Sequence, residues 1–334
     1  MSELNSPIPT STIEYYRPLP PPLARPPRER YWLHILLLLG TIFTTLVVGA
    51  RMEYGFRHNL APFTAGEEYM PFFPIGWVLA HPSRLLLGIP FSATLLGILL
   101  AHEMGHYLFC RYYRVRATLP FFIPAPTMIG TLGAVIRIKA PIPSRKALFD
   151  IGIAGPIAGF VVAVTALGFA LNLSQPLTIS KNASDIQLGF PWIFYLMHDL
   201  LRSIVPGYAI VALPLSRVYL HPTAVAAWVG MYATALNLLP SGQLDGGHIV
   251  YALVPRAHRV ISWITVAGLA FIGRFNYGWW FWALVILVMN VITFRHEQAP
   301  EYPLLPPSRW VMGLLALILL ALTFTVSPLQ VIQK

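Results

Sequence analysis

The sequence predicts an all-α polytopic membrane protein with about seven transmembrane helices and a small membrane-embedded β-hairpin. Hydrophobic residues make up 56% of the 334 residues and charged residues only 11%, whereas an ordinary soluble domain carries about 25% charged residues. Apolar runs of membrane-helix length recur along the chain, with basic residues at alternate ends. One stretch between two of these runs is rich in proline and glycine and has strand-like arms instead.

Charge and cysteine usage limit the partners that the chain can have. The formal net charge is +10, which we attribute to basic loops facing a cytoplasm-like side and its anionic lipids. Nucleic acid is therefore not an expected partner. The single cysteine, Cys110, excludes an intramolecular disulfide, and any metal site must use histidine and carboxylate ligands.

Composition divides the chain into four parts. These are a disordered, Pro-rich cytoplasmic tail (1–30), a first transmembrane helix with an external loop (31–83), a core of three transmembrane helices (84–250) and three C-terminal transmembrane helices (251–334). The seven spans are expected at about residues 32–50, 84–108, 148–172, 222–239, 259–273, 278–294 and 308–326. Arg30 before the first span and Arg111 after the second mark inward ends, which places the N-terminus in the cytoplasm.

Three segments between the spans have patterns of their own. Residues 118–144 contain strand-like arms around a turn-rich centre, and we predict a re-entrant hairpin or small sheet there, because non-helical backbone at membrane depth must be covered by protein or line a cavity. The external loop 173–221 should hold an amphipathic helix near residues 190–204. A short interfacial helix is expected near residues 74–81.

The second span carries the pattern H-E-x-x-H at its inner end. His102 and His106 are four residues apart and share a helix face, so both imidazoles can reach one metal ion. Glu103 lies beside the first ligand and can accept a proton from water, as in zinc hydrolases. Ionisable groups inside a membrane-length apolar segment are costly and indicate function.

A catalytic zinc usually takes three protein ligands, so a third is needed. Asp150 and Asp245 both lie beside a predicted inward helix end, at the depth of His102. Asp245 is the better candidate, because Pro240 and the glycines around it should break the fourth helix and let a side chain turn inward. Asn237 is a hypothesis for positioning the substrate or an oxyanion, with a plain interhelical hydrogen bond as the alternative.

Other residues that stand out receive structural interpretations. The small-residue spacing on the third span indicates close helix packing, and the tryptophan cluster at the start of the sixth span resembles an interfacial aromatic belt. Isolated histidines in loops or at helix ends are interpreted as solvated or interfacial. These residues are Gly152, Gly155 and Gly159; Trp279, Trp280 and Trp282; and His34, His81, His198, His221 and His296.

The motifs together resemble the site-2 protease family of intramembrane zinc metalloproteases (peptidase family M50). H-E-M-G-H lies on one span, F-D-I-x-x-A-G-P-x-A-G on the next and N-L-L-P-x-x-x-L-D-G-G on the one after, in family order between Thr94 and His248. The chain is similar to the branch without an inserted PDZ domain, which includes plant chloroplast and bacterial homologues. The resemblance implies one catalytic Zn²⁺ bound by His102, His106 and Asp245, with Glu103 as general base.

The resemblance also implies the partners of the protein. It implies hydrolysis of peptide bonds in or near transmembrane segments of other membrane proteins, in regulated intramembrane proteolysis, with a β element contacting the substrate. His248 departs from the related sequences, which often carry arginine there. We expect a multi-pass protein of a bacterial inner membrane, with an organelle membrane as the alternative. Two other classes remain open: a metal-ion transporter or channel, and a catalytically silent membrane scaffold.

Overall fold

The computed structural model describes residues 30–60, 70–177, 186–208, 210, 212–292 and 305–331. The chain divides into a short N-terminal unit, Met1–Arg30, and a second unit, Tyr31–Lys334. Apart from Arg30, the tail predicted to be disordered lies outside the described residues. The described helices and strands all belong to the second unit, whose fold is mostly helical with small two-stranded sheets.

Three stretches of helix in the described part of the chain are long and apolar enough to cross a membrane. The 24 residues of α3 alone extend about 36 Å, more than the roughly 30 Å of a bilayer core. Ser144 begins α4, because its hydroxyl accepts a hydrogen bond from the amide of Ala147 at 3.1 Å. The first three predicted spans form α1 (Tyr31–Arg57), η1 with α3 (Pro82–Gly88 and Ile89–Tyr112) and α4 (Arg145–Leu173).

The other four predicted spans also form helices, but shorter ones. A helix of 16 residues covers about 24 Å, which is less than the thickness of a bilayer core. Proline opens three of these helices at the first turn, where its missing amide hydrogen costs no hydrogen bond. They are α6 (Pro222–Asn237), α8 (Pro255–Ile272), α9 (Gly278–Ile292) and α10 (Pro307–Thr323).

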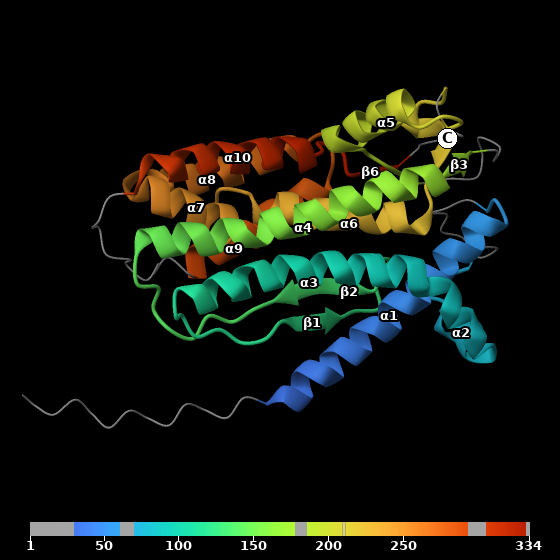
Figure 1. The fold of residues 1–334 in the computed structure, drawn as a ribbon, viewed down its shortest axis with the longest axis horizontal. Helices are drawn as coiled ribbons and strands as arrows, with labels where there is room; N and C mark the ends of the chain where they lie inside the picture. The colour runs from blue at the N-terminus through green and yellow to red at the C-terminus, as the bar shows by residue number, and fades with distance from the viewer. Residues whose placement is uncertain are drawn as a thin grey trace, which may run out of the picture. The chain divides into compact units, whose positions relative to one another are not determined.

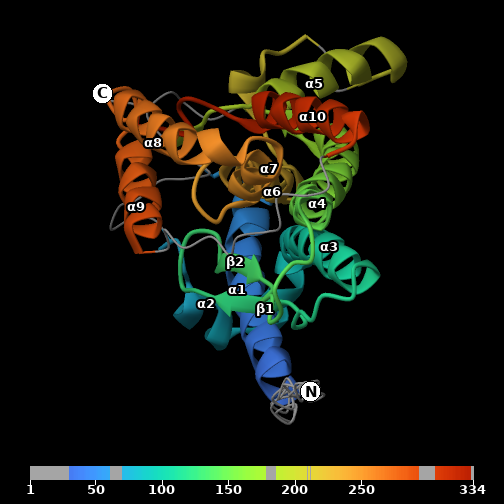
Figure 2. The same cartoon turned by 90° about the vertical axis from the view of Figure 1, so that its left-hand side faces the viewer.

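Helix α6 lies at the centre of the second unit. Viewed along the long axis, α6 and the short α7 (Asp245–Leu253) are surrounded by α8 and α9, α10, α4, α3 and α1 (Figure 2). Most side chains of α6 are buried accordingly. Helices α3 and α4 run side by side along the unit (Figure 1). This arrangement brings the part of α3 that carries the H-E-x-x-H pattern against α4, α6 and the first residue of α7.

The strand-like segment forms a hairpin, as predicted. Strand β1 (Phe121–Pro124) pairs antiparallel with β2 (Thr131–Val135), with Phe121 opposite Val135 and a bulge before Pro124. Gly130 adopts a φ of +84° where the chain turns against α1, and its carbonyl accepts a hydrogen bond from Thr44 at 2.5 Å. Hairpin and α1 therefore pack directly on each other (Figure 1).

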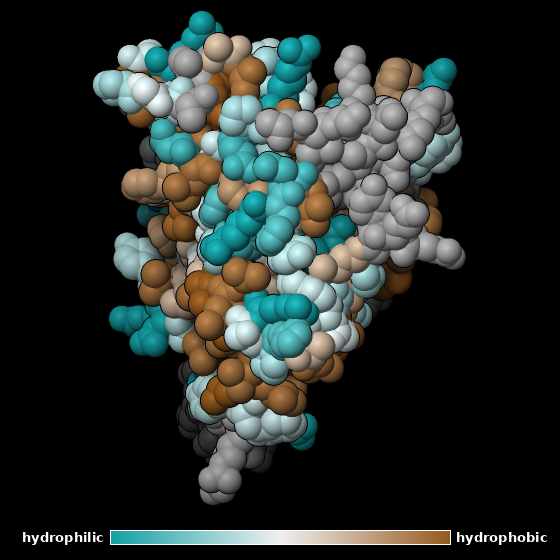
Figure 3. Space-filling view, turned by 90° about the vertical axis from the view of Figure 1, so that its right-hand side faces the viewer, coloured by the Kyte–Doolittle hydropathy of each residue, from teal (hydrophilic) through white to brown (hydrophobic). Residues whose placement is uncertain are grey.

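The end of the unit at which α3 begins holds the remaining elements (Figure 1). Its surface mixes polar and apolar side chains (Figure 3). Helices α2 (Ile75–Ala80) and α5 (Trp192–Ile204) confirm two predicted short helices. Two small antiparallel sheets were not predicted, because each pairs strands of only two or three residues that are distant in sequence. In the first sheet, β3 (Gln175–Pro176) pairs with β5 (Val218–Tyr219). In the second, β4 (Ile186–Leu188) pairs with β6 (Leu329–Val331). The short helix η2 (Leu215–Arg217) directly precedes β5.

The interpretation of the isolated histidines was wrong for two of them. His34 is buried, because its ring stacks on Phe121 of the hairpin with centroids 3.8 Å apart. His198 is buried too, and its Nδ1 lies 3.1 Å from the hydroxyl of Tyr208. His81 is exposed as expected, His221 is half-buried 3.6 Å from a carboxylate oxygen of Glu53, and His296 lies outside the described residues.

One member of the tryptophan cluster also departs from the prediction. Trp279 is fully buried, stacks on Phe324 and donates its indole N–H to the carbonyl of Val326 at 2.6 Å. A buried tryptophan satisfies its single donor inside the protein, so Trp279 fixes α9 against the end of α10. Trp280 remains about half exposed, at 49%.

Candidate metal centre

The two histidines of the H-E-x-x-H pattern converge on one point. Both lie on the buried face of α3, with His102 5% and His106 7% exposed. Their Nε2 atoms are 3.1 Å apart. The spacing of four residues puts both rings on the same side of the helix, as the sequence predicted.

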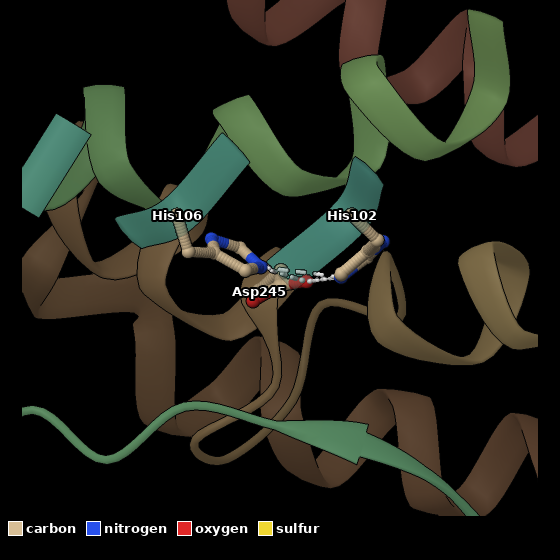
Figure 4. Close-up of side chains that lie close together, drawn as sticks. All are labelled: His102, His106 and Asp245. Carbon is tan, nitrogen blue, oxygen red and sulfur yellow. Dashed lines mark hydrogen bonds and ion pairs between the residues drawn. The ribbon is translucent and has the colours of Figure 1, made fainter. Parts of the chain in front are cut away.

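Asp245 completes the cluster from a distant part of the chain. It is the first residue of α7, and its Oδ2 lies 3.2 Å from Nε2 of His102 and 3.3 Å from Nε2 of His106. Figure 4 shows the three side chains pointing toward one another. Ligand atoms around a tetrahedral zinc with bonds of 2.0–2.1 Å lie about 3.3 Å apart. The donor set and its spacing therefore fit zinc, and within the described ranges no other group of three potential ligands meets in this way.

A short loop between α6 and α7 places Asp245. Gly242 adopts a φ of +56°, and its amide lies 3.3 Å from the hydroxyl of Ser262 on α8. Asn290 of α9 donates to the hydroxyl of Ser241 at 3.1 Å. A side chain at Gly246 would overlap the backbone carbonyl of Leu238. The glycines thus permit the tight turn between α6 and α7, and hydrogen bonds from α8 and α9 fix the position of this loop.

His106 is oriented by a backbone carbonyl. Its Nδ1 donates a hydrogen bond to the carbonyl oxygen of Ile151 on α4, at 2.8 Å. Because a carbonyl can only accept, the hydrogen must sit on Nδ1, which leaves the lone pair of Nε2 directed at the cluster. This is the outer-shell arrangement that fixes metal-binding histidines.

The glycines of α4 form the surface on which the two imidazoles rest. A Cβ added at Gly155 would overlap the ring of His106, and one at Gly159 would lie 3.1 Å from Cβ of His102. On the other side, a Cβ at Gly105 would meet the carbonyl oxygen of Ala154 at 2.5 Å. The small-residue spacing predicted close helix packing, and here that packing seats the histidine rings.

Glu103 and Asn237 both border the cluster. Glu103 is 6% exposed, and its carboxylate accepts a hydrogen bond from the backbone of Ile136, just beyond β2. Asn237 is the last residue of α6, and its Nδ2 lies 3.3 Å from Nε2 of His102. The structure therefore gathers the five residues singled out from the sequence.

Asp150, the other candidate for the third ligand, lies elsewhere. Its carboxylate accepts hydrogen bonds from Nε and Nη2 of Arg309, at 3.1 and 2.8 Å, and from the hydroxyl of Tyr113 at 2.5 Å. Burial, together with this carboxylate, raises the pKa of Tyr113. Asp150 thus serves contacts between α4, α10 and the end of α3.

Two cavities meet at the cluster. The first, of about 260 Å³, contains the three candidate ligands together with Gln243 and His248, and we call it the polar cavity. The second, of about 190 Å³, extends between α3, β2, α6 and α9 and is lined mainly by apolar side chains, so we call it the apolar cavity. Both are lined by His102, Glu103, Ala134, Val135, Asn237 and Leu244.

Sequence reasoning missed several residues that support the site. Asn290 is a single amide in the apolar run of α9, and such a polar residue in a membrane-length segment is itself a signal. Arg309 and Ser262 gave no comparable signal, because their partners are distant in sequence. His248, whose role was doubtful, lines the polar cavity.

A helical membrane fold with an H-E-x-x-H pair and a distant aspartate around one point defines a zinc metalloprotease type of site. The chain belongs to Peptidase family M50, which matches residues 90–275. It is 32% identical over 236 residues to the probable zinc metalloprotease EGY1, chloroplastic, of Arabidopsis thaliana, covering 68% of this chain and 41% of that protein.

Two further relatives give the same result. The probable zinc metalloprotease EGY1 of Oryza sativa subsp. japonica is 32% identical over 65% of this chain and 37% of its own length. The probable zinc metalloprotease EGY2 of Arabidopsis thaliana is 27% identical over 70% of this chain and 40% of its own length. The chain thus spans about two-fifths of the length of these relatives. All three are described as chloroplastic.

Proposed function

We propose that the protein is an intramembrane zinc endopeptidase that hydrolyses peptide bonds in or near transmembrane segments of other membrane proteins. One observation carries the proposal: three donor atoms from α3 and α7 lie 3.1–3.3 Å apart, with the carboxylate of Glu103 at the same cavities. Family membership supports it. Regulated intramembrane proteolysis, such as release of a membrane-tethered factor, is the process that fits this activity.

Each residue of the cluster has a chemical role in this proposal. His102, His106 and Asp245 would hold zinc, which when bound supplies Lewis acidity and lowers the pKa of water. Glu103 accepts the proton of the attacking water and passes it to the leaving amine. The amide of Asn237, which ends α6 beside His102, orients the substrate carbonyl or its oxyanion.

The hairpin supplies a means of holding the substrate in extended form. Strand β1 occupies one edge of β2, while residues of β2 line both cavities on the side of the metal centre. A transmembrane helix must unwind before its backbone can be cut, and its released amide and carbonyl groups need partners in the membrane. Pairing of the unwound segment with β2 provides them.

We further propose that α1, α3, α4, α6, α8, α9 and α10 are seven membrane spans, with the metal centre near the cytoplasmic face. In this topology residues 84–250 form the catalytic core, between the first span (31–83) and the three C-terminal spans (251–334). Arg111 and Arg116 at the inner end of α3 support the orientation. A bacterial inner membrane is the proposed location, and the chloroplastic relatives favour an organelle membrane as the alternative.

Metal analysis combined with cleavage tests this function. Purified protein should contain close to one zinc, and His102→Ala or Asp245→Ala should lower that content. Glu103→Gln should retain zinc and lose cleavage of a synthetic transmembrane peptide. The matched control is Glu53→Gln, which alters another buried carboxylate, near the C-terminal end of α1 and outside the metal centre. This variant should cut normally. Wild-type cleavage by Glu103→Gln would refute the mechanism.

The two other classes give different results in the same preparation. A metal-ion transporter or channel would carry zinc flux into proteoliposomes, and that flux would survive Glu103→Gln. A catalytically silent scaffold would cut no peptide and would bind partners equally well with or without Glu103.

A further inference from the structure

The apolar cavity has walls from four elements. On α9, Trp282, Val285 and Met289 are spaced three and four residues apart and therefore share one face of the helix. Ala233 of α6 and Leu132 of β2 form the facing walls. His102 and Glu103 also line this cavity.

The chemistry of the lining limits what can occupy the cavity. Apart from His102, Glu103 and Asn237, its hydrogen-bonding side chains are Thr234 and Trp282. The hydroxyl of Thr234 already donates to the carbonyl of Gly230 at 2.9 Å, and the indole of Trp282 already hydrogen-bonds to Tyr232. A charged side chain placed there would lose its hydration without gaining an opposite charge other than the reactive carboxylate. An apolar side chain would instead be removed from water or lipid against apolar walls.

The size of the cavity fits one side chain. Its volume of about 190 Å³ exceeds that of an engineered apolar cavity of roughly 150 Å³ that binds benzene. A leucine, isoleucine, methionine or phenylalanine side chain therefore fits, whereas alanine would leave most of the space empty. The small side chain of Ala233 on α6 leaves the cavity open, since any larger residue there would project into it.

The position of the cavity relates it to the peptide bond that is cut. Strand β2 runs past both cavities, which share Ala134 and Val135. Successive side chains of an extended segment point to opposite sides. A segment paired with β2 at Glu103 thus directs one side chain next to the reacting bond away from the polar cavity and toward the apolar one.

We propose that the apolar cavity is a specificity site, formed chiefly by Ala233 and Trp282, that binds one uncharged apolar side chain adjacent to the scissile bond. The proposal rests on the proposed endopeptidase function. It assigns the substrate class at that position to medium-sized and large apolar residues and excludes charged ones.

Peptide cleavage by the purified full chain tests this site. The cut position in a synthetic alanine–leucine transmembrane peptide is first read by mass spectrometry, and each flanking residue is then varied among Ala, Leu, Phe and Asp. The wild type should prefer Leu or Phe over Ala at one flanking position by at least about 10-fold, since pocket discrimination of this kind reaches roughly 10–200-fold per methylene. Asp should not be cut.

Two substitutions change the cavity in opposite directions. Ala233→Phe fills it and should reverse the preference toward Ala, while Trp282→Ala enlarges it and should raise the ratio of Phe to Leu. The controls are Val288→Phe and Phe281→Ala, which alter exposed side chains of α9 and should keep the wild-type ratios. Zinc content is measured for every variant. If Ala233→Phe fails to fold or to retain zinc, Trp282→Ala decides the outcome.

Binding separates failure of this proposal from failure of the proposed function. The same peptides, labelled fluorescently, are titrated against Glu103→Gln, alone and combined with Trp282→Ala. Leu peptides should bind more tightly than Ala peptides, with the Phe peptides gaining in the double variant. If the wild type cuts nothing but this preference is measured, the endopeptidase function fails and the site stands. Unchanged ratios in Trp282→Ala, in cleavage or in binding, overturn the specificity site.

Discussion

The imidazole of His106 donates from Nδ1 to the backbone carbonyl of Ile151, 2.8 Å away on the neighbouring helix α4. This contact exists only because α3 and α4 approach closely, and Gly155 leaves the space that the ring occupies. Helix packing and ligand orientation are therefore one feature of the fold, and substitutions in α4 should affect metal binding without touching a ligand.

Gly155→Ala tests that dependence directly. The added methyl group would overlap the ring of His106, so the ring must turn and its Nε2 must leave the cluster. We expect zinc affinity to fall by at least about 10-fold, in the range measured for outer-shell substitutions, when zinc loss is followed against a competing chelator. Gly168→Ala on the same helix meets its nearest atom at 3.5 Å and should bind zinc normally. Equal affinities in the two variants would contradict the interpretation.

Asn290→Ala should weaken zinc binding by acting on the loop that positions Asp245. The substitution removes the hydrogen bond to Ser241, in the loop that leads to Asp245, and so loosens the third ligand relative to the histidine pair. A loss of about 10-fold in zinc affinity is expected, with helix content by circular dichroism unchanged. Asn172→Ala removes an exposed amide at the far end of α4 and is the control. An Asn290→Ala protein with wild-type affinity would show that the loop holds its position without α9.

Arg309→Ala should lower stability more than a surface substitution. Removing the guanidinium leaves the carboxylate of Asp150 buried with only the hydroxyl of Tyr113. Breaking a fully buried ion pair costs about 3–5 kcal/mol, and because the side chain of Arg309 is 25% exposed we expect about 2 kcal/mol. The free energy of unfolding in detergent is the measurement.

A paired variant serves as the control for that prediction. Asp150→Asn combined with Arg309→Gln removes both charges and should recover much of the lost stability, because no unpaired charge stays buried. Should Arg309→Ala unfold at the same denaturant concentration as the wild type, the pair contributes nothing to the fold.

The sequence was informative where the physical signal is local. Apolar runs predicted the helices α1, η1 with α3, α4, α6, α8, α9 and α10 to within about four residues at each end, except that α1 continues to Arg57 instead of ending near residue 50. Proline with glycine between two runs predicted the hairpin at 118–144, because hydrophobicity and backbone freedom are read from adjacent residues. The spacing of His102 and His106 predicted their shared face for the same reason.

The rest of the site depends on contacts between distant segments. Nothing near Asp150 in the sequence indicates that Arg309 of α10 neutralises it and so leaves Asp245 for the cluster. The stacking of His34 on Phe121 and the burial of Trp279 likewise follow from how helices pack, and local composition suggested an exposed or interfacial position for both. The small sheets β3–β5 and β4–β6 are too short to have a periodic pattern.

X-ray absorption at the zinc edge of the purified protein is the most direct measurement of the metal centre. The arrangement predicts two imidazole nitrogens and at least one oxygen at about 2.0–2.1 Å, with no sulfur, and loss of the bound zinc in Asp245→Ala. A sulfur shell at about 2.3 Å, which would have to come from Cys110 or from a methionine, or an Asp245→Ala protein with an unchanged spectrum, would contradict it.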